Sequence, residues 1–296
     1  MSIIESIQVA MEAILANRMR SALTMLGIIF GVGAVIAAVS MTKGAAEASM
    51  ERWEQIGTNK LTIMPGQMMR GPVRAGNVET LTVGDAKAIG DQVSRIETVA
   101  PMKRSSMQVK AGNQNTNTTI VASIPSYIES EKMTLLDGRV FTDDEVDGRK
   151  KLAILGSEVV ETLFGEDAAV VGERIKIQGM SFEVIGQLAE KGSSGFMSPD
   201  DTIVIPLDTG IYRLMGSSSR SGGVRDAVSG INVLMASSDD IASVRSQIST
   251  LLRERHGLGD DAEDDFSIMA AADMVESAEA SNQIMTLLFG AIAAVS

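Results

Sequence analysis

SALTMLGIIFGVGAVIAAVSMT, the stretch from Ser21 to Thr42, decides the class of this protein. All 22 of its residues are uncharged, and most of them are apolar. An α-helix rises about 1.5 Å per residue, so this stretch reaches roughly 33 Å, and the hydrocarbon core of a bilayer is about 30 Å thick. We therefore predict a transmembrane helix over residues 21–43.

Charged residues bound this stretch on both sides. Arg18 and Arg20 precede it and Lys43 follows it, so we assign these three side chains to the membrane boundaries. A cleaved signal peptide is the competing interpretation. Its apolar region is shorter, about 7–15 residues, and ends at a small-x-small cleavage site. The longer run found here favours a helix that is retained.

Small residues form one surface of the predicted span. Gly27 and Gly31 make a G-x-x-x-G motif. In lipid, small residues allow the backbones of two helices to approach closely, so we name these glycines as candidates for helix packing. The alternative is that glycine is simply frequent in membrane helices.

Residues 1–20 predict a short amphipathic helix ahead of the span. Ile3, Ile7, Met11 and Ile14 form an apolar stripe at helical spacing. Such a helix lies at a membrane surface. The charges do not decide on which side it lies, because basic residues flank the span at both ends and large domains translocate with little regard to charge.

The C-terminal end of the sequence is also apolar. The 13 residues from Ile284 to Ser296 carry no charge. They are too few to cross a bilayer, so we expect residues 283–296 to begin a second transmembrane helix that continues past Ser296. A buried C-terminal helix of a soluble domain is the alternative, because apolar runs of about 10–14 residues often form one.

Residues 44–282 are predicted to form one domain, in which the first and the last part of this range together make one subdomain. Its first part and its last part each show the order strand, helix, strand: Leu61–Met64, Val83–Gln92 and Ile96–Met102, then Ile231–Met235, Asp239–His256 and Phe266–Ala270. Thr82 and Asp85 form a capping signal for the first of these helices. Residues 126–223 hold short strands, polar turns and one helix at Glu158–Phe164, which indicates a mostly β insertion. We therefore divide the domain into 44–125 with 224–282, and 126–223.

Composition excludes several classes of function. The formal net charge is −12, and the chain contains one His and no Cys. An acidic protein lacks the basic face that a nucleic acid requires, so we expect no nucleic-acid partner. Without Cys, the chain has no disulfide, no thiolate zinc site and no cysteine nucleophile.

No catalytic, cofactor-binding or metal site is predicted from motifs. The sequence contains no G-x-x-x-x-G-K-[ST] loop to hold ATP. Asp143–Gly148 (DDEVDG) resembles the start of a calcium loop, but the twelfth position is Ile154 where that loop needs Glu. His256 precedes Gly257 at the end of a predicted helix and is interpreted as a cap. The acidic run Gly259–Asp265 is interpreted as a solvated loop, with weak cation binding as the alternative. We expect neither an enzyme nor a cofactor on this chain.

Two stretches connect the chain to a known family. Asn17–Gly31 (NRMRSALTMLGIIFG) closely resembles the first membrane helix of the MacB-type permeases of ABC transporters. Gly57–Gly66 (GTNKLTIMPG) resembles the first strand of their extracytoplasmic domain. Shorter matches follow at Leu81–Ile89, Val99–Pro101, Asp137–Thr142, Leu152–Gly156, Leu163–Gly165 and Val184–Gly186. The resemblance covers essentially the whole sequence, and the first two stretches together are specific.

The resemblance implies an architecture. It implies an α+β membrane protein that forms a homodimer with four membrane helices per subunit, set in the bacterial cytoplasmic (inner) membrane with the large domain outside. Residues 1–20 then lie at the cytoplasmic surface. Residues 44–125 and 224–282 correspond to a porter-like subdomain of β-α-β units, and residues 126–223 correspond to a β-rich, sabre-like insertion.

The resemblance also implies a function. Members of the family work by mechanotransmission, in which a separate or fused ATPase moves the membrane helices and these move the outer domains. With no ATP-binding loop on this chain, we expect a separate ABC ATPase subunit and a membrane-fusion adaptor as partners of an efflux permease. Two alternatives stay open: a lipoprotein-release or cell-division permease of the same superfamily, and a membrane-anchored sensor or binding module without transport. No substrate can be read from the residues.

Overall fold

A computed structural model of the chain describes residues 11, 16–56, 59–66, 69–70, 73–74, 80–166, 168–192, 198–216 and 226–270, together with the single positions 273, 281, 284, 285 and 288. The chain divides into two compact units. Unit 1 consists of Met1–Trp53 and Ala272–Ser296, and unit 2 consists of Glu54–Ala271.

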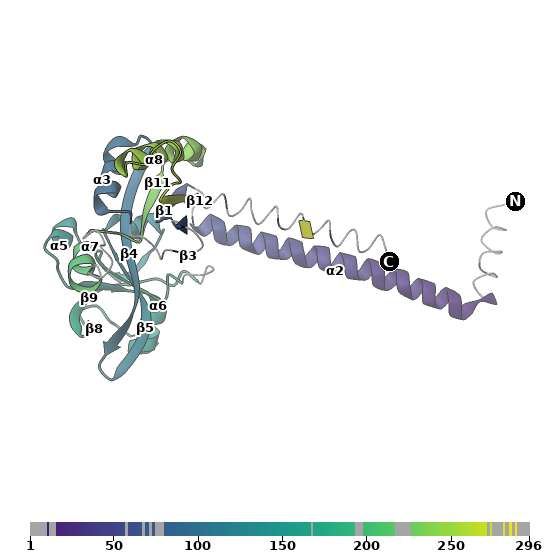
Figure 1. Cartoon of the computed structure of the whole chain (residues 1–296). Helices are drawn as coiled ribbons and strands as arrows, with labels where there is room; N and C mark the ends of the chain where they lie inside the picture. The colour runs from purple at the N-terminus through teal and green to yellow at the C-terminus, as the bar shows by residue number, and fades with distance from the viewer. Residues whose placement is uncertain are drawn as a thin grey trace. The chain divides into compact units, whose positions relative to one another are not determined.

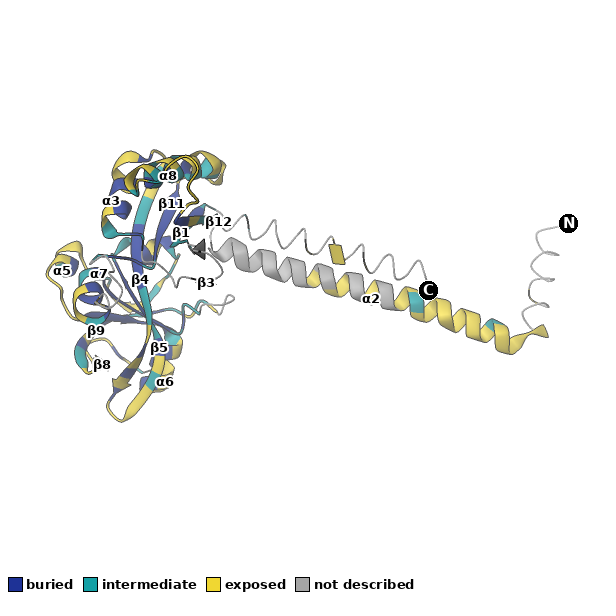
Figure 2. Cartoon of the chain, in the orientation of Figure 1, coloured by how far each residue is buried: buried dark blue, intermediate teal, exposed yellow. Residues whose placement is uncertain are grey.

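One long helix dominates the described part of unit 1. Helix α2 (Arg18–Ile56) contains 39 residues, so it includes the predicted helical residues 21–43 and continues beyond them to Ile56. Its large apolar side chains are exposed, among them Leu23, Ile29 and Phe30 (Figure 2). The exposed apolar residues that the structure describes on α2 lie between Met19 and Met41, and a contiguous apolar surface of this kind marks an interaction site.

The membrane segments remain predictions. Within the described stretches, no helix combines the length and the apolarity that crossing a bilayer requires. The transmembrane helix over residues 21–43 is therefore not confirmed. Most of residues 1–20 and 283–296 lie outside the described residues, and so do the helices that the sequence predicts there.

Unit 2 is built on one ten-stranded sheet. Its strands are β1 (Lys60–Pro65), β4 (Ile96–Ala111), β5 (Gln114–Ser123), β6 (Leu135–Gly138), β7 (Leu152–Leu155), β8 (Arg174–Ile177), β9 (Met180–Leu188), β10 (Thr202–Pro206), β11 (Gly230–Met235) and β12 (Phe266–Ala270). Their order is β12-β1-β11-β4-β5-β10-β7-β9-β6, and β8 pairs with β4 and β9. Strands β2 (Met69–Arg70) and β3 (Val73–Arg74) form a separate ladder. The core lies along β7, β10 and β11, in which nearly every residue is buried (Figure 2).

Short and long helices cover this sheet (Figure 1). They are α3 (Val83–Gln92), α4 (Ser126–Ser130), α5 (Asp143–Asp147), α6 (Ser157–Phe164), α7 (Leu207–Thr209), the π-helix η1 (Gly210–Leu214), the 3-10 turn η2 (Ser238–Asp240) and α8 (Ile241–Arg255). Helices α3 and α8 are neighbours, and α3 also contacts β4 while α8 contacts β12.

The two strand–helix–strand units are confirmed. The predicted strands correspond to β1, the start of β4, β11 and β12, and the predicted helices to α3 and α8. Helix α3 begins with the predicted capping box, in which Thr82 and Asp85 each bind the other's backbone N–H. In α8, Val244, Ile248 and Leu252 are fully buried.

The middle of the chain differs from the prediction. Residues 126–223 contain α4, α5, α7 and η1 in addition to the predicted helix, so the expectation of a single helix was wrong. Helices of three to five residues leave no periodic pattern in a sequence. The stretch Asp143–Gly148 forms α5 and its C-cap instead of a calcium loop, because Thr142 and Glu145 make a second capping box. The strands of 126–223 also share one sheet with β4, β5 and β11.

Candidate functional site: the paired strands β1 and β12 and two polar clusters

Strands β1 and β12 carry both chain connections between the two units. Helix α2 ends at Ile56 and β1 begins at Lys60, while β12 ends at Ala270, directly before the second segment of unit 1. The two strands are antiparallel neighbours at one edge of the sheet, with Leu61 opposite Ala270 and Met64 opposite Ser267. Both connections therefore reach the same edge of the sheet.

The side chains of β1 point alternately to the two faces of the sheet, and their contacts on both faces hold the strand in this position. Leu61 and Ile63 point into the core and are completely buried. Thr62 points to the other face, where its hydroxyl donates to Oδ1 of the buried Asn232 on β11 at 3.1 Å. At the end of β1, the Gly66 N–H donates to the Asp265 carbonyl at 2.7 Å, and a Cβ on Gly66 would lie 2.7 Å from the Asp265 carbonyl carbon. Only glycine fits at that contact.

A first polar cluster, which we call the Glu131 cluster, begins at Lys60. Its members come from β1, β4, β11, α4 and the segment after β9: Lys60, Arg104, Asn232, Tyr127, Glu131 and Lys191. The Glu131 carboxylate receives Lys60 Nζ at 3.0 Å and Asn232 Nδ2 at 2.5 Å. Lys191 Nζ donates to the Glu131 backbone carbonyl.

Cations outnumber anions at the Glu131 cluster. Lys60 forms an ion pair with Glu131, and the Arg104 guanidinium lies 4.0 Å from the same carboxylate. Arg104 also donates to the Tyr127 hydroxyl at 3.0 Å, and burial raises the pKa of Tyr127 to about 12. Burial lowers the pKa of Lys191, while Glu131 acts in the opposite direction. The Glu131 carboxylate is the point at which Lys60, Arg104 and Asn232 converge.

A second polar cluster, the His256 cluster, lies where α3 and α8 meet the chain that leads into β12. Asp85 of α3 accepts from Arg255 Nε at 2.7 Å, and its other oxygen lies 3.4 Å from His256 Nε2. The opposite ring nitrogen, Nδ1, contacts Asp265 at 2.7 Å. The single histidine thus bridges two carboxylates, and both of them are buried.

The protonation of Asp85 follows from these contacts. Burial alone would raise the pKa of Asp85, but the hydrogen bonds from Arg255, Thr82 and His256 together hold it below its ordinary value of 3.8. Asp85 is therefore ionised at neutral pH, and it attaches α3 to the last turn of α8.

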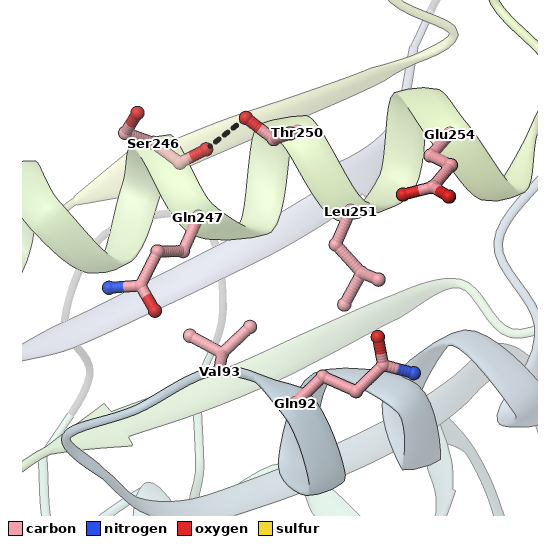
Figure 3. Close-up of a pocket in the computed structure, with 7 residues that line it drawn as sticks. All are labelled: Gln92, Val93, Ser246, Gln247, Thr250, Leu251 and Glu254. Carbon is pink, nitrogen blue, oxygen red and sulfur yellow. Dashed lines mark hydrogen bonds between the residues drawn. The ribbon is translucent and has the colours of Figure 1, made fainter.

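A shallow groove separates α3 from α8 (Figure 3). Its volume is about 320 Å³, and it is lined by Gln92, Val93, Ser246, Gln247, Thr250, Leu251 and Glu254. Val93 and Leu251 face each other across it, and the remaining lining side chains are polar (Figure 3). Gln247 closes one end by accepting from the backbone and hydroxyl of Ser94.

The residues singled out from the sequence lie on α2. Arg18 and Arg20 are exposed in its first turn, and Lys43 belongs to the same helix. Gly27 and Gly31 are one turn apart, and a Cβ on Gly27 would meet no described atom within 4 Å. The structure therefore places these residues on one helix and leaves their predicted roles untested.

Sequence reasoning missed both polar clusters. It interpreted His256 as a helix cap, and the backbone does place His256 at the C-cap of α8, but its ring also joins two carboxylates. Lys60 lies in the Gly57–Gly66 stretch but was given no role, Glu131 belongs to no motif, and the two residues are 71 positions apart. The one available signal was Lys60, a charged residue directly at the start of an apolar strand. A lysine that is buried there needs a partner.

The arrangement of strands and chain connections resembles that of known proteins. The fold is that of a mixed α/β domain inserted between two chain segments through neighbouring strands. The chain belongs to the family of the MacB-like periplasmic core domain, whose model matches residues 21–251. The family resemblance seen in the sequence is thereby confirmed.

Relatives and solved structures agree with this assignment. The chain is 31% identical to the macrolide export ATP-binding/permease protein MacB of Bdellovibrio bacteriovorus over 296 residues, covering 99% of this chain and 44% of the relative. It is 34% identical to the protein of that name from Chlorobaculum tepidum, covering 94% and 42%. This chain thus spans less than half the length of these relatives.

Two solved structures share the fold. The periplasmic region of MacB from Actinobacillus actinomycetemcomitans matches with a TM-score of 0.63 at 21% identity, covering 78% of this chain and 98% of that one. The extracellular domain of the noncanonic ABC-type transporter YknZ from Gram-positive bacteria matches with a TM-score of 0.56 at 21% identity, covering 71% and 100%.

Proposed function

We propose that this chain is the permease part of an ABC-type efflux transporter that exports its substrate on the outer side of the bacterial cytoplasmic membrane. Membership of the MacB-like periplasmic core domain family supports this proposal. The structural observation that carries it is the pairing of β1 with β12, because both connections to unit 1 enter the sheet through these adjacent strands.

The mechanism is mechanotransmission. Residues 21–43 span the membrane, with Arg18 and Arg20 at the cytoplasmic boundary and Lys43 at the outer one. The exposed apolar side chains of α2 support this placement, because lipid would cover them. Movement of the membrane helices pulls on β1 and β12, and the hydrogen-bonded sheet carries that movement into unit 2.

The proposed partners complete the transporter. In this proposal, ATP hydrolysis is supplied by an ABC ATPase subunit, and the names of the relatives, which are ATP-binding/permease proteins, support an ATPase of this kind. A membrane-fusion adaptor receives the substrate, and a second copy of this chain completes a homodimer. The Gly27–Gly31 face packs against another membrane helix.

The absence of an ATP-binding loop gives a direct test. The purified 296-residue chain should neither bind nor hydrolyse ATP, and this can be measured by nucleotide titration and by phosphate release. ATP binding to the isolated chain at micromolar concentration would contradict the proposal of a separate ATPase.

Efflux is tested in cells and in vesicles. Deleting the gene should raise the accumulation of a labelled macrolide, the substrate class named for the relatives, and the wild-type gene should reverse this. The native complex, purified through a tag on this chain and reconstituted in vesicles, should move the macrolide only with ATP. Unchanged accumulation together with lipoproteins retained in the cytoplasmic membrane would instead favour the lipoprotein-release alternative.

A further inference from the structure

Glu131 lies at the junction between β1 and the insertion at residues 126–223. We propose that the buried Lys60–Glu131 ion pair is the coupling element that transmits displacement of β1 to this insertion. The inference rests on the proposed function, and it assigns positioning roles in that function to two residues for which the sequence predicted none.

Lys60 is placed where motion of α2 would arrive first. It is the first residue of β1, four positions after the end of α2, and its side chain is buried. Its Nζ lies 3.0 Å from Oε2 of Glu131, which is the C-cap residue of α4. Helix α4 is the first element of the insertion. A shift of β1 along its axis must therefore either move α4 with it or separate this pair.

Burial makes separation of the pair costly. Lys60 and Glu131 expose only 9% and 17% of their side chains, so water cannot replace either partner fully. Removing one partner from a buried pair leaves an uncompensated charge, whereas an exposed pair is replaced by hydration at little cost. The pair therefore resists stretching and transmits displacement between the two elements.

Further contacts join the same carboxylate to the rest of the sheet. Its second oxygen binds Asn232 of β11, and Asn232 in turn accepts from Thr62 of β1. The Glu131 backbone carbonyl receives Lys191, whose own backbone N–H donates to Asp200 at 2.9 Å. The Glu131 side chain thus connects α4 with β1 and β11, and its backbone carbonyl adds the connection to the later part of the insertion.

The chain offers a matched control pair. Arg139 and Glu145 form a two-bond ion pair at 2.7 and 2.8 Å, but both residues belong to the insertion and Arg139 is exposed. The test variants are Lys60→Met, Glu131→Gln and the double variant of both. The control is the double variant Arg139→Met with Glu145→Gln.

The double variant separates coupling from folding. Lys60→Met removes the nearest cation from Glu131, and Glu131→Gln removes the ion-pair partner of the buried Lys60. Each single variant should therefore lower the melting temperature, while the double variant should recover most of that loss. In the native complex, all three test variants should move at least tenfold fewer macrolide molecules per ATP hydrolysed, with ATPase rates within twofold of wild type. The control should transport within twofold of wild type. Transport that recovers together with the melting temperature in the double variant would overturn the inference.

A distance measurement makes the test independent of transport. The chain has no Cys, so spin labels on Lys87→Cys in α3 and Glu161→Cys in α6, both exposed, report on the sheet and the insertion alone. In the complex, ATP with vanadate should change this distance in wild type and not in the Glu131→Gln variant. Equal changes in both would overturn the coupling inference and leave efflux intact. No change in wild type would overturn mechanotransmission as well.

Discussion

At the scale of single residues, Asp85 should make stability depend on pH. Its pKa is held below 3.8 in the folded state, so its contribution is present above that pH and is lost as the pH falls through the folded-state pKa. At pH 7, Asp85→Asn should lower the free energy of unfolding of residues 54–271 by about 2 kcal/mol, because charge-assisted hydrogen bonds are weakened. Denaturant unfolding at pH 7 and at pH 3 measures this.

The control for Asp85 lies on the same helix. Asp91 of α3 is exposed, and Asp91→Asn should change the unfolding free energy by less than about 0.5 kcal/mol at either pH. If Asp85→Asn lowered the free energy of unfolding as much at pH 3 as at pH 7, the contribution of Asp85 to stability would come from packing and not from its charge.

At the scale of elements, the π-helix η1 depends on close contact with β5. A Cβ on Gly210 would lie 2.1 Å from the Cβ of Ala122, although the backbone at Gly210 has an ordinary φ of −62°. Gly210→Ala should therefore destabilise unit 2 by about 1–3 kcal/mol through overpacking. Gly259→Ala is the matched control, because no atom lies within 4 Å of the added Cβ. Denaturation midpoints that agree within error for the two variants would contradict this account of the contact.

At the scale of the whole molecule, the proposed topology places the two ends of α2 on opposite sides of the membrane. Asn113 is exposed in the turn between β4 and β5, and Ser6 lies in the N-terminal segment. In intact cells, or in spheroplasts where an outer membrane blocks entry, a membrane-impermeant maleimide should label the Asn113→Cys variant. The Ser6→Cys variant should stay unlabelled until lysis, because a single span separates the two positions.

The reverse labelling pattern would contradict the proposed topology. If the Ser6→Cys variant were labelled in intact cells and the Asn113→Cys variant were not, unit 2 would lie in the cytoplasm. An exporter whose working domain lies outside would then be excluded. Because the native chain has no Cys, the maleimide can label this protein only at the introduced cysteine.

Much of the fold could be predicted because its signals are local. The capping box at Thr82 and Asp85 and the apolar strands β1, β11 and β12 are visible within windows of a few residues. The hairpin of β4 and β5 was not predicted in full. Asn115 and Asn117 of β5 are residues that are unfavourable in strands. Strand β5 is held in place by its pairing with β4 and with β10, and by the turn at Gly112.

The sequence by itself determined the family, a helix over residues 21–43, the acidic character and the strand–helix–strand units, since each depends on composition or on neighbouring residues. Only the tertiary structure decided that β1 lies beside β12, that Lys60 meets Glu131 and that His256 joins Asp85 to Asp265. These partners are far apart in the sequence or carry no periodic pattern. A buried charge specifies that a partner must exist, but only the packing of the sheet determines which residue it is.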